Sequence, residues 1–203
     1  MRIVIVDYGM GNIKSIVSTL KYLGVEDVVL SSEFGILDSA DKIILPGVGS
    51  YGKAIEQIRL KKIDQYLNEI VIKKKKPLLG ICLGMQILGM YSTEAGHNLG
   101  LGYVDGYVTK FDNTLSQVPH VGFNQVKVDS MLRLYHGFDD EADFYFTHSY
   151  RMFSEADINQ CYCSYQDDFV ASFEHQNIAG TQFHPELSQS NGLKLLKNFI
   201  NKF

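Results

Sequence analysis

The sequence is poor in cysteine and contains no long apolar run. Its three cysteines are an odd number, so we expect no disulfide framework and a reducing, cytoplasmic environment. No uncharged run reaches the roughly 18 to 20 apolar residues that a membrane-spanning helix requires, so no membrane association is expected. The N-terminus lacks the long apolar stretch of a signal peptide, and residues 3–6 are typical of a short buried strand instead.

An excess of positive charge is also absent. The formal net charge is -4 at pH 7, which argues against a general affinity for nucleic acid. A phosphate-binding patch is one interpretation of the basic run at residues 73–76. The run lies between a predicted helix and a predicted strand, where lysines solvate a chain reversal and favour a helix C-terminus. We therefore assign it no function.

The rest of the composition is that of an ordinary globular chain. Hydrophobic residues make up 45% and charged residues 21% of the 203 positions, which suits one domain spanning residues 1–203 with a full core. No internal repeat, low-complexity tract or Pro/Ser-rich linker divides the chain.

The first half alternates short apolar runs with helical periodicity. We predict strands at residues 3–6, 28–30, 42–45 and 77–81. We predict helices at residues 13–23, 51–58 and 63–72, and a further helix that begins near Gly84. This alternation is typical of a parallel sheet with helices on both faces.

The second half is richer in strands. We predict them at residues 103–111, 121–128, 144–147, 161–165, 170–175 and 178–183. Tight polar turns, such as the one at residues 174–177, join several of them, and a last helix at residues 193–199 packs back on the sheet. The fold class is therefore α/β, with a mostly parallel core and antiparallel strands added late.

The segment Gly80-Ile81-Cys82-Leu83-Gly84 carries the strongest chemical signal. A buried strand enters it and a helix leaves it, which is the pattern of a nucleophile elbow. Side chains at Gly80 and Gly84 would collide with the tightly turned backbone. The start of the helix stabilises a thiolate and directs amide N–H groups at a developing oxyanion. Most free cysteines are simply small buried hydrophobes, but this combination favours Cys82 as a nucleophile.

Cys161 and Cys163 provide the contrast. They lie two residues apart in an alternating run, so both face one side of a strand. No glycines flank them, and we expect them to be structural.

A thiolate nucleophile needs a histidine to hold and deliver its proton. Among six histidines, His184 stands out because a predicted strand leads directly into His184-Pro185-Glu186. Pro185 rigidifies the turn, and Glu186 is close enough to orient and charge-stabilise the imidazole. A solvated loop histidine is the default interpretation of any single His, but these neighbours favour a catalytic one. No ligand cluster accompanies His184 and Glu186, so no metal is expected.

Together, residues 80–86 and 182–186 resemble the catalytic motifs of class I glutamine amidotransferases. Further segments narrow the resemblance to the glutaminase subunits of imidazole glycerol phosphate synthases. These segments are residues 7–12, 45–49, 118–122, 144–150 and 195–199. The resemblance covers the whole chain and implies a flavodoxin-like fold with a mostly parallel central sheet, helices on both faces and added antiparallel strands.

The resemblance implies a reaction in which Cys82 attacks the side-chain amide of L-glutamine and forms a γ-glutamyl thioester. His184, held by Glu186, protonates the departing ammonia and then activates the water that releases glutamate. No cofactor is implied.

The resemblance also implies the binding groups. Residues 46–49 resemble the loop that supplies one oxyanion-hole N–H beside that of Leu83, and Gly47 and Gly49 make the required peptide flip accessible. The implied oxyanion-hole residues are Gly49 and Leu83, and the implied substrate-binding residues are Gly47, Gln86, Ser149 and Tyr150.

A partner protein is implied as the recipient of the ammonia. The first expectation is a heterodimer with a (β/α)8 cyclase subunit that serves histidine biosynthesis. Phe123 stands where the family commonly has tryptophan, and Leu187 where it commonly has lysine, both near the partner interface. Residues 102–112 also look like a sister group that feeds sugar amidotransferases in surface-polysaccharide (O-antigen) pathways. A sugar amidotransferase is therefore the alternative partner.

Three other interpretations were weighed. The loop at residues 8–12 follows a strand and carries Gly9-x-Gly11, but Lys14 replaces the third glycine of a dinucleotide-binding loop. A different Cys-His hydrolase, such as a peptidase, is disfavoured by Gln86 and by residues 46–49 and 148–150. A non-catalytic binding subunit is disfavoured by the complete set of Cys82, His184 and Glu186.

Overall fold

The structure is a computed structural model that describes residues 1–114 and 117–203. Its helices are α1 (Ile13–Tyr22), α2 (Phe34–Asp38), α3 (Tyr51–Leu60), α4 (Ile63–Leu67), α5 (Leu83–Ile87) and α6 (Gln189–Lys202), with a π-helical turn η1 (Asn68–Lys73) and a 3-10 turn η2 (Pro185–Leu187). Its strands are β1 (Arg2–Val6), β2 (Asp27–Ser31), β3 (Lys42–Leu45), β4 (Leu78–Ile81), β5 (Tyr91–Ser92), β6 (Asn98–Leu99), β7 (Tyr107–Lys110), β8 (His120–Lys127), β9 (Glu141–His148), β10 (Tyr150–Phe153), β11 (Gln160–Ser164), β12 (Asp168–His175) and β13 (Ile178–Thr181).

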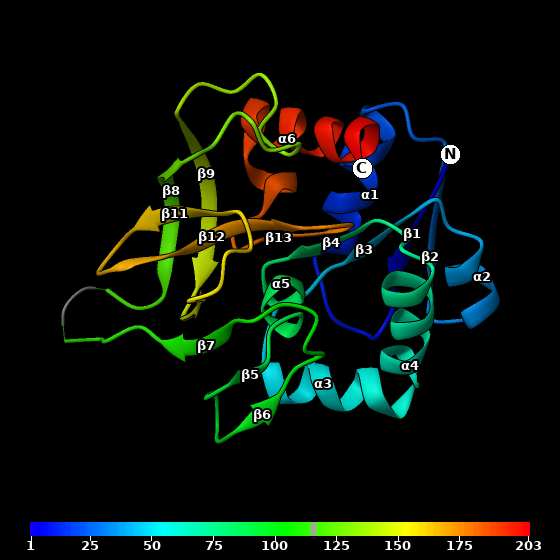
Figure 1. Ribbon diagram of the computed structural model, residues 1–203, viewed down its shortest axis with the longest axis horizontal. Coiled ribbons are helices and arrows are strands. Elements are labelled where there is room, and N and C mark those ends of the chain that lie inside the picture. The colour runs from blue at the N-terminus through cyan, green and yellow to red at the C-terminus, as the bar shows by residue number, and fades with distance from the viewer. Residues whose placement is uncertain (115–116) are drawn as a thin grey trace.

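The strands of these ranges form one mixed sheet (Figure 1). Its main path runs β2-β1-β3-β4-β13-β12-β10-β7-β5-β6. The first five strands of this path are parallel, and β12 joins β13 antiparallel. The predicted combination of a parallel core with later antiparallel strands is confirmed. The last parallel strand, β13, comes from the end of the chain and lies beside β4, which carries the elbow cysteine.

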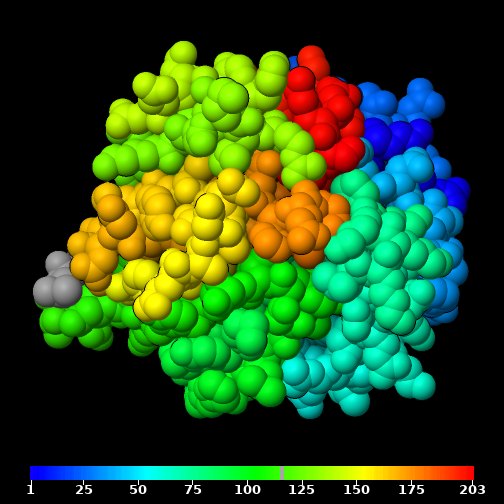
Figure 2. Space-filling model, viewed as in Figure 1, coloured from blue at the N-terminus to red at the C-terminus, as the bar shows by residue number. Residues whose placement is uncertain are grey.

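Helices cover both faces of the parallel core because side chains alternate along each strand. On β1, Val4 and Val6 pack in the same cluster as apolar residues of α3 and α4. Ile3 and Ile5 pack on the other face, with residues of α1 and α6. Figure 1 shows α1 and α6 on one side of the sheet, with α3 and α4 on the other. Figure 2 shows the red C-terminal helix packed next to the blue N-terminal segments.

A second group of strands extends the sheet away from the parallel core. β11 pairs with both β12 and β8, and β8 pairs along its length with β9. The chain leaves β9 through Ser149 and enters β10 directly. This group brings residues 147–150 to the same end of the sheet as the elbow cysteine.

Three details differ from the prediction. The strand expected at residues 103–111 is only Tyr107–Lys110, because the amides of Tyr103 and Val104 donate to the carbonyl of Leu88 and hold a turn against α5. The helix expected at residues 63–72 is α4 followed by the π-helical turn η1. Helix α2 and strands β5, β6 and β10 were not predicted, since all four are short and lack a clear periodicity.

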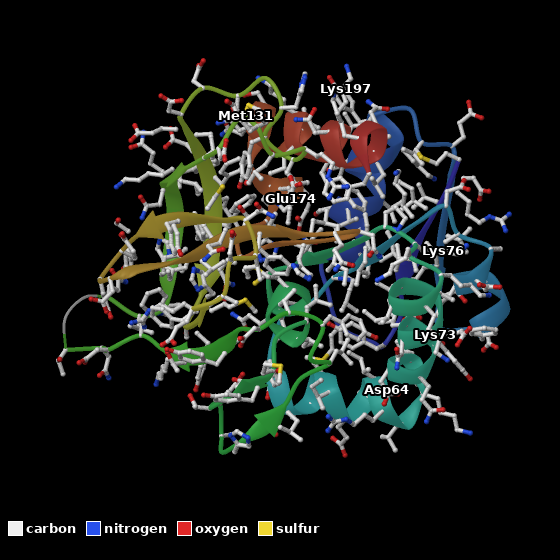
Figure 3. All side chains as sticks on the ribbon, in the orientation of Figure 1. Asp64, Lys73, Lys76, Met131, Glu174 and Lys197 are labelled. Atoms are coloured by element: carbon white, nitrogen blue, oxygen red, sulfur yellow. The ribbon has the colours of Figure 1, made fainter. Side chains whose placement is uncertain are left out.

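The surface carries no unusual charge feature around the basic run. Lys73 pairs with Glu69, Lys74 pairs with Asp38, and Lys76 donates to main-chain oxygens of Asp38 and Ala40. The run begins at the last residue of η1 and ends before β4, so it joins a helical turn to a strand as predicted. Figure 3 shows Lys73 and Lys76 at the right of the view. Met131 is exposed, and Glu174 is buried. Among residues 1–114 and 117–203, none of the helices combines the length and apolarity needed to span a bilayer.

Candidate active site

Cys82 occupies a sharp turn between β4 and α5. Its φ of 53° lies in the left-handed region, which non-glycine residues adopt at a cost and mostly at functional positions. Its amide donates to the carbonyl of Thr181 on β13 at 2.7 Å, so the turn is tied to the neighbouring strand. A Cβ on Gly84 would lie 1.9 Å from the Leu45 carbonyl oxygen, and one on Gly80 would lie 2.8 Å from the Met85 backbone. The predicted need for both glycines is confirmed.

His184 reaches the same place from β13. Its amide donates to the carbonyl of Tyr145 at 2.9 Å, and the hydroxyl of Ser188 donates to its carbonyl at 2.6 Å. Its Nδ1 lies 2.9 Å from Oε1 of Glu186. Because a carboxylate only accepts hydrogen bonds, Nδ1 carries the proton and Nε2 is left for chemistry. The side chains of His184 and Glu186 are 3% and 0% exposed, so water does not weaken the pair.

The charges of the site favour a protonated His184. Burial acts to lower its pKa, but the hydrogen bond and charge of Cys82, followed by those of Glu186, outweigh burial and raise the pKa from 6.5 to about 10. An imidazolium of this kind stabilises a thiolate beside it. Asn12 adds a weak donor, with Nδ2 3.4 Å from Oε1 of Glu186. Burial and the charge of Cys82 also raise the pKa of Tyr8 above its usual 10, so this tyrosine stays neutral.

A pocket of about 340 Å³ opens in front of Cys82. It is lined by Val48, Gly49, Cys82, Leu83, Gln86, Glu94, Pro119, Thr147, His148, Ser149 and Tyr150. Six of the nine predicted site residues therefore line a single cavity. His184, Glu186 and Gly47 do not belong to this lining, and the first two form a hydrogen-bonded pair next to Cys82.

Gly47 lies against the elbow rather than in the pocket. Its carbonyl accepts a hydrogen bond from the amide of Leu83 at 3.3 Å. A Cβ at this position would lie 2.6 Å from the hydroxyl of Tyr8 and 2.7 Å from the amide nitrogen of Gly84. Gly49 has a φ of 103°, which suits glycine. The Leu83 amide is thus occupied by the loop in this conformation.

The geometry of an elbow cysteine and a buried His–Glu pair agrees with the comparisons with known proteins. The family model described as Glutamine amidotransferase class-I matches residues 4–203. The chain belongs to the class I glutamine amidotransferase family. This amidotransferase is therefore an enzyme that hydrolyses glutamine.

Two full-length curated relatives of the amidotransferase are named as HisH subunits. It is 39% identical over 199 residues, 98% of each chain, to "Imidazole glycerol phosphate synthase subunit HisH 1" of Campylobacter jejuni (strain RM1221). It is 38% identical over 203 residues to the corresponding HisH subunit of Aquifex aeolicus (strain VF5), with 100% of this chain and 97% of the relative covered.

Solved structures with a similar fold support the fold class of the amidotransferase. A glutamine amidotransferase from Thermotoga maritima matches with a TM-score of 0.69 at 18% identity, over 100% of this chain and 97% of that one. Another structure described as a glutamine amidotransferase matches with a TM-score of 0.76 at 18% identity, over 97% and 96%. The predicted fold class is confirmed.

The sequence analysis of the amidotransferase missed two polar residues at the site. Glu94 lines the pocket, and its Oε2 accepts a hydrogen bond from the amide of Tyr51 at 2.9 Å. Gln182 lies against Cys82, with Nε2 3.7 Å from Sγ. Glu94 follows no motif, and only its place in the folded chain reveals it. Gln182 precedes the His184 turn, so the register of β13 against β4 is the signal that finds it.

His148 also lines the pocket, in a neutral form. Its Nδ1 lies 2.8 Å from the carbonyl of Tyr150, which can only accept, so Nδ1 carries the proton. Nε2 then accepts from Nδ1 of His120 at 3.1 Å. Burial lowers the pKa of His148 to about 3 and that of His120 to about 4. Across the described ranges, no group of three or more His, Cys, Asp or Glu side chains is arranged to hold a metal ion.

Proposed function

We propose that the chain hydrolyses L-glutamine to glutamate and ammonia with Cys82, His184 and Glu186 as its catalytic residues, and that residues 1–203 act as one amidotransferase domain. The observation that carries the proposal is the elbow cysteine placed beside a buried, hydrogen-bonded His–Glu pair. A histidine protonated by this environment keeps the cysteine as a thiolate, which is the nucleophilic form.

The first half-reaction forms a thioester. The sulfur of Cys82 attacks the δ-carbon of glutamine, and the carbonyl oxygen becomes an oxyanion. His184 passes its Nε2 proton to the nitrogen as the C–N bond breaks, and ammonia leaves. Glu186 holds Nδ1 throughout, which fixes the ring and stabilises its positive charge.

The second half-reaction releases glutamate. His184 is now neutral and takes a proton from water as the water oxygen attacks the thioester carbon. The C–S bond breaks, glutamate departs, and the thiolate–imidazolium pair is restored. Nothing but glutamine and water is consumed.

The oxyanion requires a change in the loop at residues 46–49. The Leu83 amide is directed at the position of the oxyanion, but it donates to the Gly47 carbonyl in the present conformation. Turning of the loop removes this carbonyl and directs the Gly49 amide toward the site, and the two N–H groups then stabilise the oxyanion. Glycine at both ends makes the turn accessible.

Gln86 and Glu94 recognise the α-ammonium group of the substrate. The Nε2 of Gln86 donates to the carbonyl of Tyr150 at 2.8 Å and to Oε1 of Gln182 at 2.9 Å. Both of its hydrogens are therefore used, and its oxygen is left to accept from the substrate in the pocket. Glu94 adds the negative charge that an ammonium group requires. Ser149 and Tyr150 form the wall that holds the amino-acid end.

We further propose a heterodimer with a (β/α)8 cyclase subunit that consumes the ammonia, acting in the cytoplasm in histidine biosynthesis. The names of the relatives in C. jejuni and A. aeolicus support this partner over a sugar amidotransferase. Exposed apolar side chains surround the site: Val48, Val121, Phe123 and Leu187 are 39%, 57%, 50% and 38% exposed. Such residues are typical of a surface that another subunit covers.

The test is glutamate release by the purified chain with the cyclase and the nucleotide ligand of the cyclase. Wild-type chain is expected to release glutamate, and Cys82→Ser is expected to release none above background. Normal turnover by Cys82→Ser would contradict the mechanism. Failure to co-purify with the cyclase, together with binding to a sugar amidotransferase, would contradict the partner and leave the chemistry intact.

A further inference from the structure

Gln182 is a fully buried amide that the reaction steps above do not use. Its residue exposure is 0%, and its amide N–H donates to the carbonyl of Ala171 at 2.7 Å. Strand β13 pairs with β4 so that Thr181 aligns with Ile81. Gln182 and Cys82 directly follow these two strands, and the amide of Cys82 donates to the carbonyl of Thr181, so the two residues are neighbours. The register places this side chain beside the nucleophile.

The orientation of the Gln182 amide follows from its neighbours. The carbonyl of Tyr150 can only accept, so the group of Gln86 that faces it must be the NH2. That same NH2 faces Gln182 at 2.9 Å, so Gln182 presents its oxygen to Gln86. The nitrogen of Gln182 must then face the sulfur of Cys82, at 3.7 Å. A backbone carbonyl thus fixes the direction of both amides.

We propose that Gln182 is a positioning residue, which donates a hydrogen bond to the Cys82 thiolate and links the nucleophile to the substrate-binding Gln86. This inference rests on the proposed function. A thiolate has two requirements in a buried site, a counter-charge and hydrogen-bond donors. His184 provides the first, and Gln182 provides an uncharged donor from the side of β13. Unlike His184, it gives up no proton during the reaction, so it can hold the sulfur in both half-reactions.

The hydrogen bonds of the Gln182 side-chain amide argue against a role in core packing alone. Glutamine that only filled space in the core would leave a buried NH2 group without an acceptor, which is costly. Here the NH2 group faces the sulfur of Cys82, which carries the negative charge of the thiolate. The hydrogen bond therefore favours the charged sulfur over the neutral thiol, and its loss affects reactivity before it affects folding.

The experiment compares Gln182→Met, Gln182→Glu and a control, Gln65→Met, on the exposed surface of α4. Cys82 alkylation by iodoacetamide is followed as a function of pH in the chain alone, and kcat and KM for glutamine are measured with the cyclase partner. Burial raises the pKa of Cys161 to about 11 and of Cys163 to about 12, so alkylation near neutral pH reports on Cys82. Cys82→Ser supplies the background.

Gln182→Met is expected to slow alkylation near neutral pH about tenfold and to lower kcat about tenfold, as the loss of one hydrogen bond to a charged group predicts. The pH of half-maximal alkylation is expected to rise. Gln182→Glu keeps the shape, still accepts from Gln86 and adds a repelling charge, so it should slow alkylation further. Gln65→Met should match the wild type.

Wild-type alkylation profiles in both Gln182 variants would overturn the inference. So would a loss of turnover with an unchanged alkylation profile, because Gln182 would then support only the fold. Neither result affects the proposed function, which depends on the separate outcome for Cys82→Ser. If Gln182→Met does not fold, the alkylation profile of Gln182→Glu is sufficient to test the inference.

Discussion

The amide of Leu83 donates to the carbonyl oxygen of Gly47 at 3.3 Å, so the donor that we propose for the oxyanion already has an acceptor in this conformation. Alkylation of Cys82 forms no oxyanion and does not need this donor, whereas glutamine hydrolysis does. We expect partner binding to raise glutamine turnover without a parallel rise in the alkylation rate. Iodoacetamide kinetics and glutamate release, measured with and without the cyclase, check this. A parallel rise in both would place the activation at Cys82 instead of the loop.

Two glycines should respond oppositely to alanine. Gly84→Ala places a Cβ 1.9 Å from the Leu45 carbonyl oxygen, a clash with backbone that cannot move aside. We expect a loss of more than about 4 kcal/mol in the free energy of unfolding, or no folded protein. Gly35→Ala, in α2, meets nothing within 4 Å and should gain up to about 1 kcal/mol. Urea denaturation measures both, and a well-folded Gly84→Ala variant would contradict the elbow geometry.

The stability of the protein should fall at high pH through His184. Its pKa in the folded state is about 10, against 6.5 as the usual value. A raised pKa stabilises the folded state fully below about pH 6.5, and the contribution is lost as the pH rises toward about 10. His184→Gln should remove this part of the pH dependence. The measurement is the denaturation midpoint of the wild type and of His184→Gln between about pH 6.5 and pH 10. An equal decline in the two proteins would contradict the role of His184 in this pH dependence.

Glu94→Gln should weaken substrate binding more than it slows the chemistry. The amide oxygen can still accept from Tyr51, so the local structure survives, but the negative charge facing the α-ammonium group is lost. We expect KM for glutamine to rise about tenfold or more with a smaller change in kcat. Glu56→Gln, an exposed carboxylate on α3, is the matched control. An unchanged KM would remove Glu94 from the binding site.

Phe123→Ala should weaken the complex with the cyclase. This side chain is 50% exposed and contacts the ring of Tyr145 at a centroid distance of 5.6 Å, close to the His184 turn. Truncation of an aromatic anchor at an interface lowers affinity by about 2 kcal/mol, or roughly thirtyfold. Met131→Ala, at an 88% exposed position, should leave affinity unchanged. Equal affinities for the two variants would place the interface elsewhere.

Local sequence patterns predicted the parallel core and the turn at Cys82, because short-range packing and backbone constraints determine both. The apolar runs of β1, β3 and β4 predicted the parallel core, and the two glycines around Cys82 predicted the elbow because each must avoid a backbone clash. The strand expected at residues 103–111 begins only at Tyr107, because main-chain hydrogen bonds to Leu88 hold a turn at Tyr103 and Val104. That contact is between distant segments and has no signature in the local sequence.

At the site, too, some residues are predictable from local sequence and others only from the folded chain. Cys82 and the pair of His184 and Glu186 are each recognisable from their own short segments. Gln182 and Glu94 are ordinary polar residues until the fold brings them to the sulfur and to the pocket. Their contributions depend on strand register and loop packing, which periodicity does not reveal.

The position of β13 between β4 and β12 has a consequence for the order in which the site matures during synthesis. The elbow at Cys82 belongs to the early part of the chain, but its amide is tied to Thr181 and its histidine follows in the next turn. A nascent chain that has emerged only through β12 carries Cys82 without His184, the proposed base. The late strand both completes the parallel core and brings the proposed base to Cys82, so on the proposed mechanism the thiol gains its base only when the sheet is complete.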